Sequence, residues 1–223
     1  AEVTQSKYLF DSVEKTLKPL HKLLNFWQAL RWLSPHKFNH NGQQFPHPGL
    51  APLLSGRFGD LMTVVSQGQV TSAKPKDKKA VEAINNLLTQ TSAIVERENF
   101  LSWEVAFPTV WQHLEHSESA GGFDIIISNP PWERVKLQEI EWFAVHKTEI
   151  AQAPRAADRK KLIARLQKKG DALWEDYTTA KMCAETAAKV ARTFGAYPLL
   201  SGGDVNLYAL FVERAQRLAA PQG

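Results

Sequence analysis

Hydrophobic residues recur every three or four positions over much of this chain, a spacing that predicts helices with one buried face. The N-terminal run 8–32 has this period and contains Pro19, so we expect a kink there, or two helices that meet at the proline. Residues 34–59 are rich in Pro, Gly, His and Asn without any period, which predicts a long loop that forms a binding surface or is poorly ordered. The segment 74–100 predicts a second long helix, whose buried stripe consists of Val81, Ile84, Leu88, Thr91 and Val95.

The C-terminal half has the same helical character. Residues 137–149 and the strongly basic run 155–169 each predict a helix. Asp171 can cap a third helix that extends to Thr193 and ends at Gly195, and Asp204 can cap a fourth over 205–219. We expect the buried positions to include Leu207, Leu210, Phe211 and Leu218 in the last helix, together with Trp174, Tyr177 and Tyr208.

Two short segments instead predict strands. LSWEVAFP (101–108) alternates until Pro108 stops it, and FDIII (123–127) is a dense run of β-branched residues, typical of a strand buried on both faces of a parallel sheet. The expected fold class is therefore a helix-rich α/β fragment, since this many helices and so few strands cannot complete a sheet. We expect a mainly helical region over 1–99, strands over 100–136, a helical insertion over 137–200 and a returning helix over 201–223.

Composition restricts the class of protein without fixing its function. The chain is 43% hydrophobic and 22% charged, as in soluble globular proteins, and no apolar run approaches the roughly 18 residues of a membrane-spanning helix. The single cysteine, Cys183, excludes an intramolecular disulfide and favours a reducing, cytoplasmic compartment. A net charge of +4 permits a nucleic-acid partner but does not require one. His36, His40 and His47 are irregularly spaced, and we predict no metal site.

The run FDIIISNPPW (123–132) ends its predicted strand in an unusual way. The Asn129 amide oxygen and the Pro130 carbonyl are two acceptors, and the prolines hold them on a stiff turn because their φ is fixed. Two fixed acceptors suit an exocyclic amine, and accepting both of its protons makes that nitrogen more nucleophilic. Trp132 offers a flat face on which a base can stack, and a duplex base would have to flip out to reach it. The structural alternative is a strand-ending turn followed by a core tryptophan.

This run resembles the catalytic motif of the N6-adenine DNA methyltransferases, and its flanks narrow the resemblance. LSWEVAFPTVW (101–111), WERVKLQEIEWFA (132–144) and GDVNLYALFVERAQRL (203–218) are similar to segments of the large Eco57I-like, type IIG restriction-modification or phage-defence methylases. The resemblance implies a Rossmann-like methyltransferase that transfers methyl from S-adenosylmethionine to a flipped adenine in double-stranded DNA. It implies that Asn129 and Pro130 accept from the adenine amine, that Pro131 shapes the turn and that Trp132 stacks on the base.

The chain departs from that family at the cofactor site. None of its 12 glycines makes the Gly-rich loop that holds S-adenosylmethionine, and GRFGD (56–60) follows no strand-like run. The cofactor-binding residues are therefore unknown, and we expect an internal fragment that is inactive by itself. The helix predicted over 155–169 carries seven Lys or Arg against one Asp, so Arg159, Lys160, Lys161 and Arg165 are candidates for DNA backbone contact, with a solvated helix face as the alternative.

Two other functions remain open from the sequence. The chain could be a noncatalytic nucleic-acid-binding or scaffold module in which the turn is vestigial. It could also keep the methyl-transfer chemistry but act on RNA or on a protein glutamine, although the long helical insertion after the motif disfavours that reading.

Overall fold

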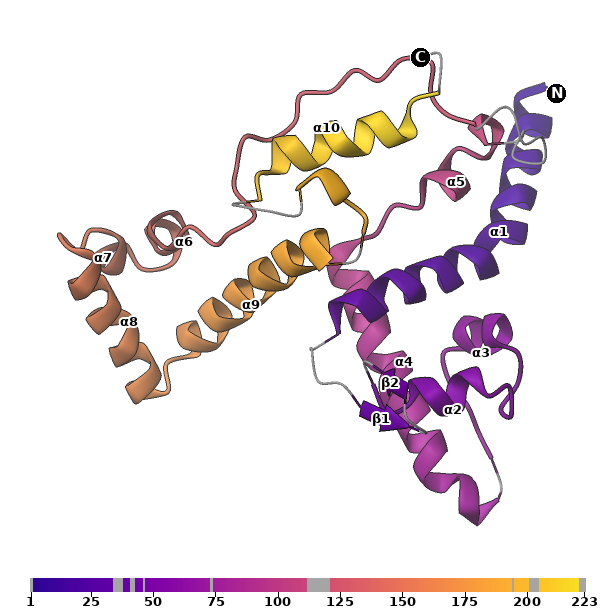
Figure 1. Ribbon diagram of the computed structural model, residues 1–223, viewed down its shortest axis with the longest axis horizontal. Helices are drawn as coiled ribbons and strands as arrows, with labels where there is room; N and C mark the ends of the chain where they lie inside the picture. The colour runs from indigo at the N-terminus through magenta and orange to yellow at the C-terminus, as the bar shows by residue number, and fades with distance from the viewer. Residues whose placement is uncertain are drawn as a thin grey trace. The chain divides into compact units, whose positions relative to one another are not determined.

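The computed structural model describes residues 2–33, 38–40, 43–45, 47–72, 74–111, 121–193, 195–200 and 205–220. They divide into two compact units, Ala1–Gly121 and Gly122–Gly223. Helices dominate both units (Figure 1).

The first unit is built on two long helices, α1 (Glu2–Trp32) and α4 (Lys78–Glu98). Helix α1 packs against α3 (Leu61–Gln67) and against α4, and α2 (Leu50–Leu54) packs against α4. The remaining elements are short: the strands β1 (Phe38–His40) and β2 (Gln43–Phe45), the helix α5 (Trp103–Ala106), and the 3₁₀ turns η1 (Pro75–Asp77) and η2 (Pro108–Val110).

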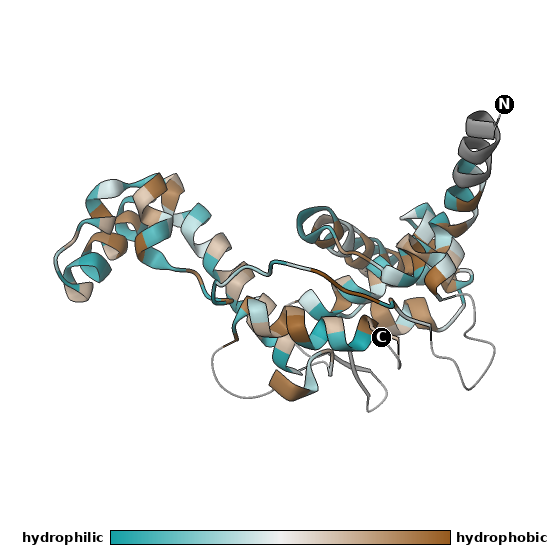
Figure 2. Cartoon of the chain, turned by 90° about the horizontal axis from the view of Figure 1, so that it is seen from above, coloured by the Kyte–Doolittle hydropathy of each residue, from teal (hydrophilic) through white to brown (hydrophobic). Residues whose placement is uncertain are grey.

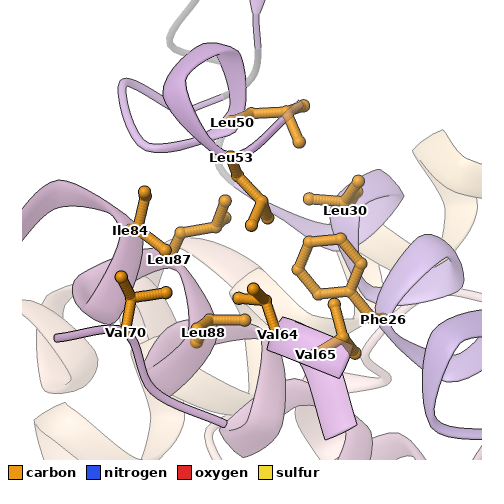
Figure 3. Close-up of a cluster of buried hydrophobic side chains, with 10 residues drawn as sticks. All are labelled: Phe26, Leu30, Leu50, Leu53, Val64, Val65, Val70, Ile84, Leu87 and Leu88. Carbon is orange, nitrogen blue, oxygen red and sulfur yellow. The ribbon is translucent and has the colours of Figure 1, made fainter. Parts of the chain in front are cut away.

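The core of this unit lies where α1, α2, α3 and α4 meet (Figure 3). Helix α4 contributes the predicted stripe: Ile84, Leu88 and Thr91 are buried, while Val81 and Val95 are half-buried. The Thr91 hydroxyl is satisfied inside its own helix by donating to the Leu87 carbonyl at 2.9 Å. The other buried hydrophobic members of this core are Phe26, Leu30, Leu50, Leu53, Val64, Val65, Val70 and Leu87.

Helix α1 runs through Pro19 without a break and changes direction partway along its length (Figure 1). A proline inside a helix removes one backbone donor and bends the helix where its ring meets the preceding turn. Of the two outcomes expected over 8–32, one continuous, bent helix is the one observed.

The region 34–59 contains more structure than its composition predicts. It holds β1, β2 and α2, while residues 34–37, 41–42 and 46 lie outside the described residues. Buried His47 orders the start of α2: its Nδ1 accepts from the Gly49 amide at 3.0 Å, so its Nε2 is the atom that donates to Asn86 Oδ1 at 2.9 Å. These are one local and one long-range contact, and neither leaves a periodic trace in the sequence.

The second unit consists of helices joined by an extended segment. In chain order these are α6 (Glu139–His146), α7 (Thr148–Ala151), α8 (Ala156–Lys169), α9 (Ala172–Thr193), the 3₁₀ turn η3 (Pro198–Leu200) and α10 (Leu207–Leu218). Helices α6 to α9 enclose a small core of Phe143, Ile150, Ile163, Leu166 and Tyr177. The helices predicted at 155–169 and 171–193 are confirmed, whereas the helix predicted at 137–149 is divided at Lys147 into α6 and α7. The Asp171 carboxylate accepts from the Leu173 amide at 3.1 Å as the predicted cap.

The last helix differs from expectation on its buried face. Leu218 is buried, but Phe211 and Tyr208 are 46% and 37% exposed. Asn206 occupies the N-cap position without a side-chain hydrogen bond, and the predicted cap Asp204 lies outside the described residues.

The α/β fold class with part of a Rossmann-like sheet is wrong for this structure. Within the described ranges, the only paired strands are β1 and β2, which form an antiparallel hairpin with Phe38 opposite Phe45. Residues 103–106 are helical because Trp103 and Phe107 stack at 5.7 Å one turn apart, which favours a helical turn over alternation. Residues 124–127 are extended but, within the described ranges, have no neighbouring strand to pair with, and Ile125 and Ile127 are 77% and 92% exposed. Figure 2 shows this hydrophobic stretch as part of a chain segment outside any helix.

Candidate functional site

The segment 123–135 is tied to α10 at both of its ends. At one end the Phe123 amide donates to the Leu218 carbonyl at 2.8 Å, and the Phe123 carbonyl accepts from the Ala220 amide at 3.0 Å. At the other end the Val135 amide donates to the Val205 carbonyl at 2.8 Å. The segment therefore runs antiparallel to α10 and is hydrogen-bonded near both ends of that helix (Figure 1).

The Asn-Pro-Pro-Trp turn lies between these two ties. Asn129 is exposed, and within the described part of the chain its side chain has no hydrogen-bond partner. Its amide oxygen, with two lone pairs, is thus available to a ligand. Pro130 and Pro131 restrict the backbone of the turn because their φ angles are fixed. The predicted acceptor group therefore lies at the surface and is not used in a hydrogen bond to another described residue.

Trp132 is also at the surface, which contradicts the alternative of a core tryptophan. The residue is 78% exposed, and its ring lies against Tyr208 of α10, with ring centroids 5.4 Å apart and planes tilted by 31°. The adjacent backbone is held because the Leu207 amide donates to the Glu133 carbonyl at 2.9 Å. A large aromatic face supported from one side and open to solvent can stack on a planar ligand.

A cleft of about 570 Å³ opens beside Trp132. Its walls come from residues 132–138, from Glu141 and Trp142 of α6, from Ala184 of α9 and from Leu207 of α10. A second cleft of about 920 Å³ shares residues 134–138 and Glu141 with the first. The two clefts therefore border the same stretch of backbone just after the turn.

Glu139, Tyr177 and Arg159 form a hydrogen-bonded cluster in the larger cleft. The Tyr177 hydroxyl donates to Glu139 Oε1 at 2.7 Å, and Arg159 Nε lies 3.4 Å from Glu139 Oε2. The hydrogen bond from Tyr177, helped by the Arg159 guanidinium, holds the pKa of Glu139 below its ordinary value. Burial first, and the Glu139 carboxylate second, raise the pKa of the Tyr177 hydroxyl, so it stays a protonated donor.

The four candidate DNA-binding cations of α8 lie in different surroundings. Arg159 faces the larger cleft and pairs with Glu139, whereas Lys160, Lys161 and Arg165 are exposed and do not line it. Lys161 lies 3.8 Å from Asp158 on its own helix. Arg159 is therefore set apart from the other three residues.

The residues of α9 that line the larger cleft are not among the site residues predicted from the sequence. Tyr177, Lys181, Glu185, Ala188 and Arg192 recur at helical spacing and occupy one face of α9. This polar stripe could have been found from its period, but a stripe of this kind is usually read as a solvated surface. The contact of Tyr208 with Trp132 is not predictable either, because an aromatic residue at a helical position is expected in the core.

The described residues do not fit S-adenosylmethionine, the cofactor that the sequence resemblance implies. A glycine-rich cradle would bring backbone amides close to the ligand after a strand. Gly56 and Gly59 instead lie between α2 and α3, both with positive φ, and a side chain added at Gly56 would meet nothing within 4 Å. They serve a turn between two helices.

Among the described residues, no group of three or more His, Cys, Asp and Glu side chains could hold a metal ion. None of the described helices is long and apolar enough to cross a membrane.

Comparison with known proteins adds one finding. The model of the Eco57I restriction-modification methylase family matches residues 22–163, a range that includes the turn at 129–132. No curated protein and no solved structure matches the chain. The match covers well over half of the 223 residues, so this chain belongs to the Eco57I restriction-modification methylase family, a family of DNA-modifying methyltransferases.

Proposed function

We propose that this chain supplies the base-binding turn of a site-specific adenine-N6 DNA methyltransferase from a restriction-modification or phage-defence system. Its substrate is an adenine flipped out of double-stranded DNA, and the donor implied by the resemblance is S-adenosylmethionine. The observation that carries the proposal is the exposed Asn129 amide, free of internal hydrogen bonds within the described residues, next to the exposed ring of Trp132.

The roles of the turn residues follow from their chemistry. Asn129 Oδ1 and the Pro130 carbonyl accept the two protons of the adenine amine, which raises the electron density on its nitrogen. Trp132 stacks on the base, a contact worth roughly 1–3 kcal/mol in comparable complexes. Pro131 keeps the turn stiff, so the acceptors need no rearrangement when the base arrives.

The cofactor sets a limit on what the chain does alone. Because the described residues offer no cradle for S-adenosylmethionine, we expect residues 1–223 by themselves to bind DNA without methylating it. The ties between 123–135 and α10 keep the turn in place, so the base-binding half of the site can be studied in the chain itself.

The test uses the complete methyltransferase that carries this sequence, with tritiated S-adenosylmethionine and DNA. Asn129→Ala is expected to abolish methyl incorporation and to leave DNA binding, measured by fluorescence anisotropy, largely intact. Ser128→Ala is the matched control: Ser128 is the exposed polar residue next to Asn129, and the variant is expected to keep its methylation activity. Methyl incorporation that survives Asn129→Ala would refute the catalytic role.

The same experiment separates the proposal from its rivals. A wild-type protein that binds DNA but never transfers methyl would be a noncatalytic nucleic-acid-binding module. Incorporation into RNA or protein in place of DNA would keep the chemistry and change the substrate.

A further inference from the structure

The larger cleft has an unusual concentration of charge. It lies within the second unit, between residues 134–141 and one face of α9, and encloses about 920 Å³. Its lining includes five cationic side chains and three carboxylates: Arg134, Lys136, Arg159, Lys181 and Arg192, and Glu139, Glu141 and Glu185. The cleft thus has an excess of positive charge.

One of the three carboxylates is already neutralised inside the protein. Glu139 accepts from the Tyr177 hydroxyl at 2.7 Å and pairs with Arg159 at 3.4 Å. Lys136 and Lys181 are exposed, and no salt bridge within 4.0 Å joins either of them to another described residue, although the charge of Lys181 helps to lower the pKa of Glu139. Lys136 comes from the segment 134–141 and Lys181 from α9, so both walls of the cleft carry an exposed ammonium group that can meet an external anion.

The spacing along α9 suits an extended polyanion better than a single small ion. Lys181 and Arg192 lie eleven positions apart on one face of the helix, which corresponds to about 16 Å at 1.5 Å per residue. Duplex DNA rises about 3.4 Å per base pair along its axis, so this face matches about five base-pair steps of a duplex that lies alongside it.

The position of the cleft connects it to the proposed base-binding turn. It shares residues 134–138 and Glu141 with the smaller cleft that contains Trp132. A nucleotide whose base stacks on Trp132 therefore has its neighbouring phosphates close to Lys136. The exposed lysines of α8 line neither cleft.

We propose that the cleft between residues 134–141 and α9 binds the phosphodiester backbone of the DNA strand that carries the target base, with Lys136 and Lys181 as phosphate contacts. This inference rests on the proposed function for its choice of DNA. It assigns the main backbone contacts to this cleft and not to Lys160 and Lys161 on the exposed face of α8.

The test compares two double variants of the full chain that remove equal charge. Lys136→Gln/Lys181→Gln changes the cleft, and Lys160→Gln/Lys161→Gln changes α8. Binding of a fluorescein-labelled DNA duplex is followed by anisotropy over a series of KCl concentrations. Each phosphate contact contributes about 0.9 to the slope of log K against log salt, so the cleft variant is expected to lose about 1.8 in slope and on the order of tenfold in affinity per lysine at 0.1 M salt.

The α8 variant is expected to keep the wild-type slope. Equal losses of affinity and salt slope in the two variants would mean that only the net charge of the protein matters, and would overturn the proposal. A cleft variant that binds DNA like wild type would overturn it too. All four lysines are exposed, and circular dichroism verifies that each variant folds.

The readout is DNA binding without a methyl donor, so its failure is distinguishable from failure of the proposed function. Normal methylation by the complete enzyme together with unchanged binding by the cleft variant would refute only this inference. Binding through the cleft with no methyl transfer would refute only the proposed function.

Discussion

The hydrogen bond between Tyr177 and Glu139 gives a prediction that can be worked out in detail. Tyr177→Phe removes only the hydroxyl and keeps the ring, which packs on Phe143 with centroids 5.0 Å apart. The lost contact is a hydrogen bond of 2.7 Å to a carboxylate, a class that contributes about 1.5–3 kcal/mol. The Glu139 side chain is 32% exposed and keeps Arg159, so water and the guanidinium replace part of the loss. We expect the second unit to lose about 1 kcal/mol at neutral pH.

The pH dependence of this loss has a definite sign. Because the folded-state pKa of Glu139 is lowered, its stabilisation is fully present above the pKa of an unfolded glutamate and disappears as the pH falls through the folded-state pKa. In Tyr177→Phe the folded-state pKa moves back toward the ordinary value. The stability difference between wild type and variant is therefore expected to shrink as the pH drops below about 4.

The assay must report on the second unit alone. The protein is equilibrated in urea at each pH and then labelled by a short hydrogen-exchange pulse at one fixed pH, and peptides from α6 and α9 are read by mass spectrometry. Tyr208→Phe is the matched control, since within the described residues its hydroxyl has no hydrogen-bond partner, and it is expected to unfold like wild type. A variant as stable as wild type at neutral pH, or a difference that grows in acid, would refute the reasoning.

Two further predictions concern packing. Phe143 is 0% exposed at the centre of the second core, so Phe143→Ala is expected to cost about 3–5 kcal/mol, and unchanged protection of α6 and α9 in the same exchange assay would contradict this. Gly49→Ala would place its Cβ 2.2 Å from the Ala83 carbonyl oxygen, so α2 must move away from α4 at a cost of about 1–3 kcal/mol; an unchanged urea midpoint for peptides of α4 would disagree.

Helices were predictable from this sequence because their signals are local. The stripe of α4 and the Asp171 cap of α9 rest on residues within a few turns of one another, and both are observed. Strands depend on partners elsewhere in the chain. The isoleucine run at 125–127 has the composition of a buried strand, but no neighbouring strand is supplied within the described residues, and the run remains extended and exposed.

The candidate site divides in the same way. The turn at 129–132 can be predicted as a candidate site from the sequence because its chemistry lies in consecutive residues. The cationic cleft brings Lys136 together with Lys181, which are far apart in the sequence, and only the packing of residues 134–141 against α9 reveals it. Tyr208 was assigned to the core because an aromatic residue in a helix does not show from sequence which neighbour it supports.

The identity of the methylated nucleoside tests the central claim most directly. DNA treated with the complete methyltransferase is digested to nucleosides, and the methylated products are identified by mass spectrometry for wild type and Asn129→Ala. The account predicts N6-methyladenine from the wild type and no methylated nucleoside from the variant. N4-methylcytosine from the wild type, or N6-methyladenine that persists in Asn129→Ala, would contradict it.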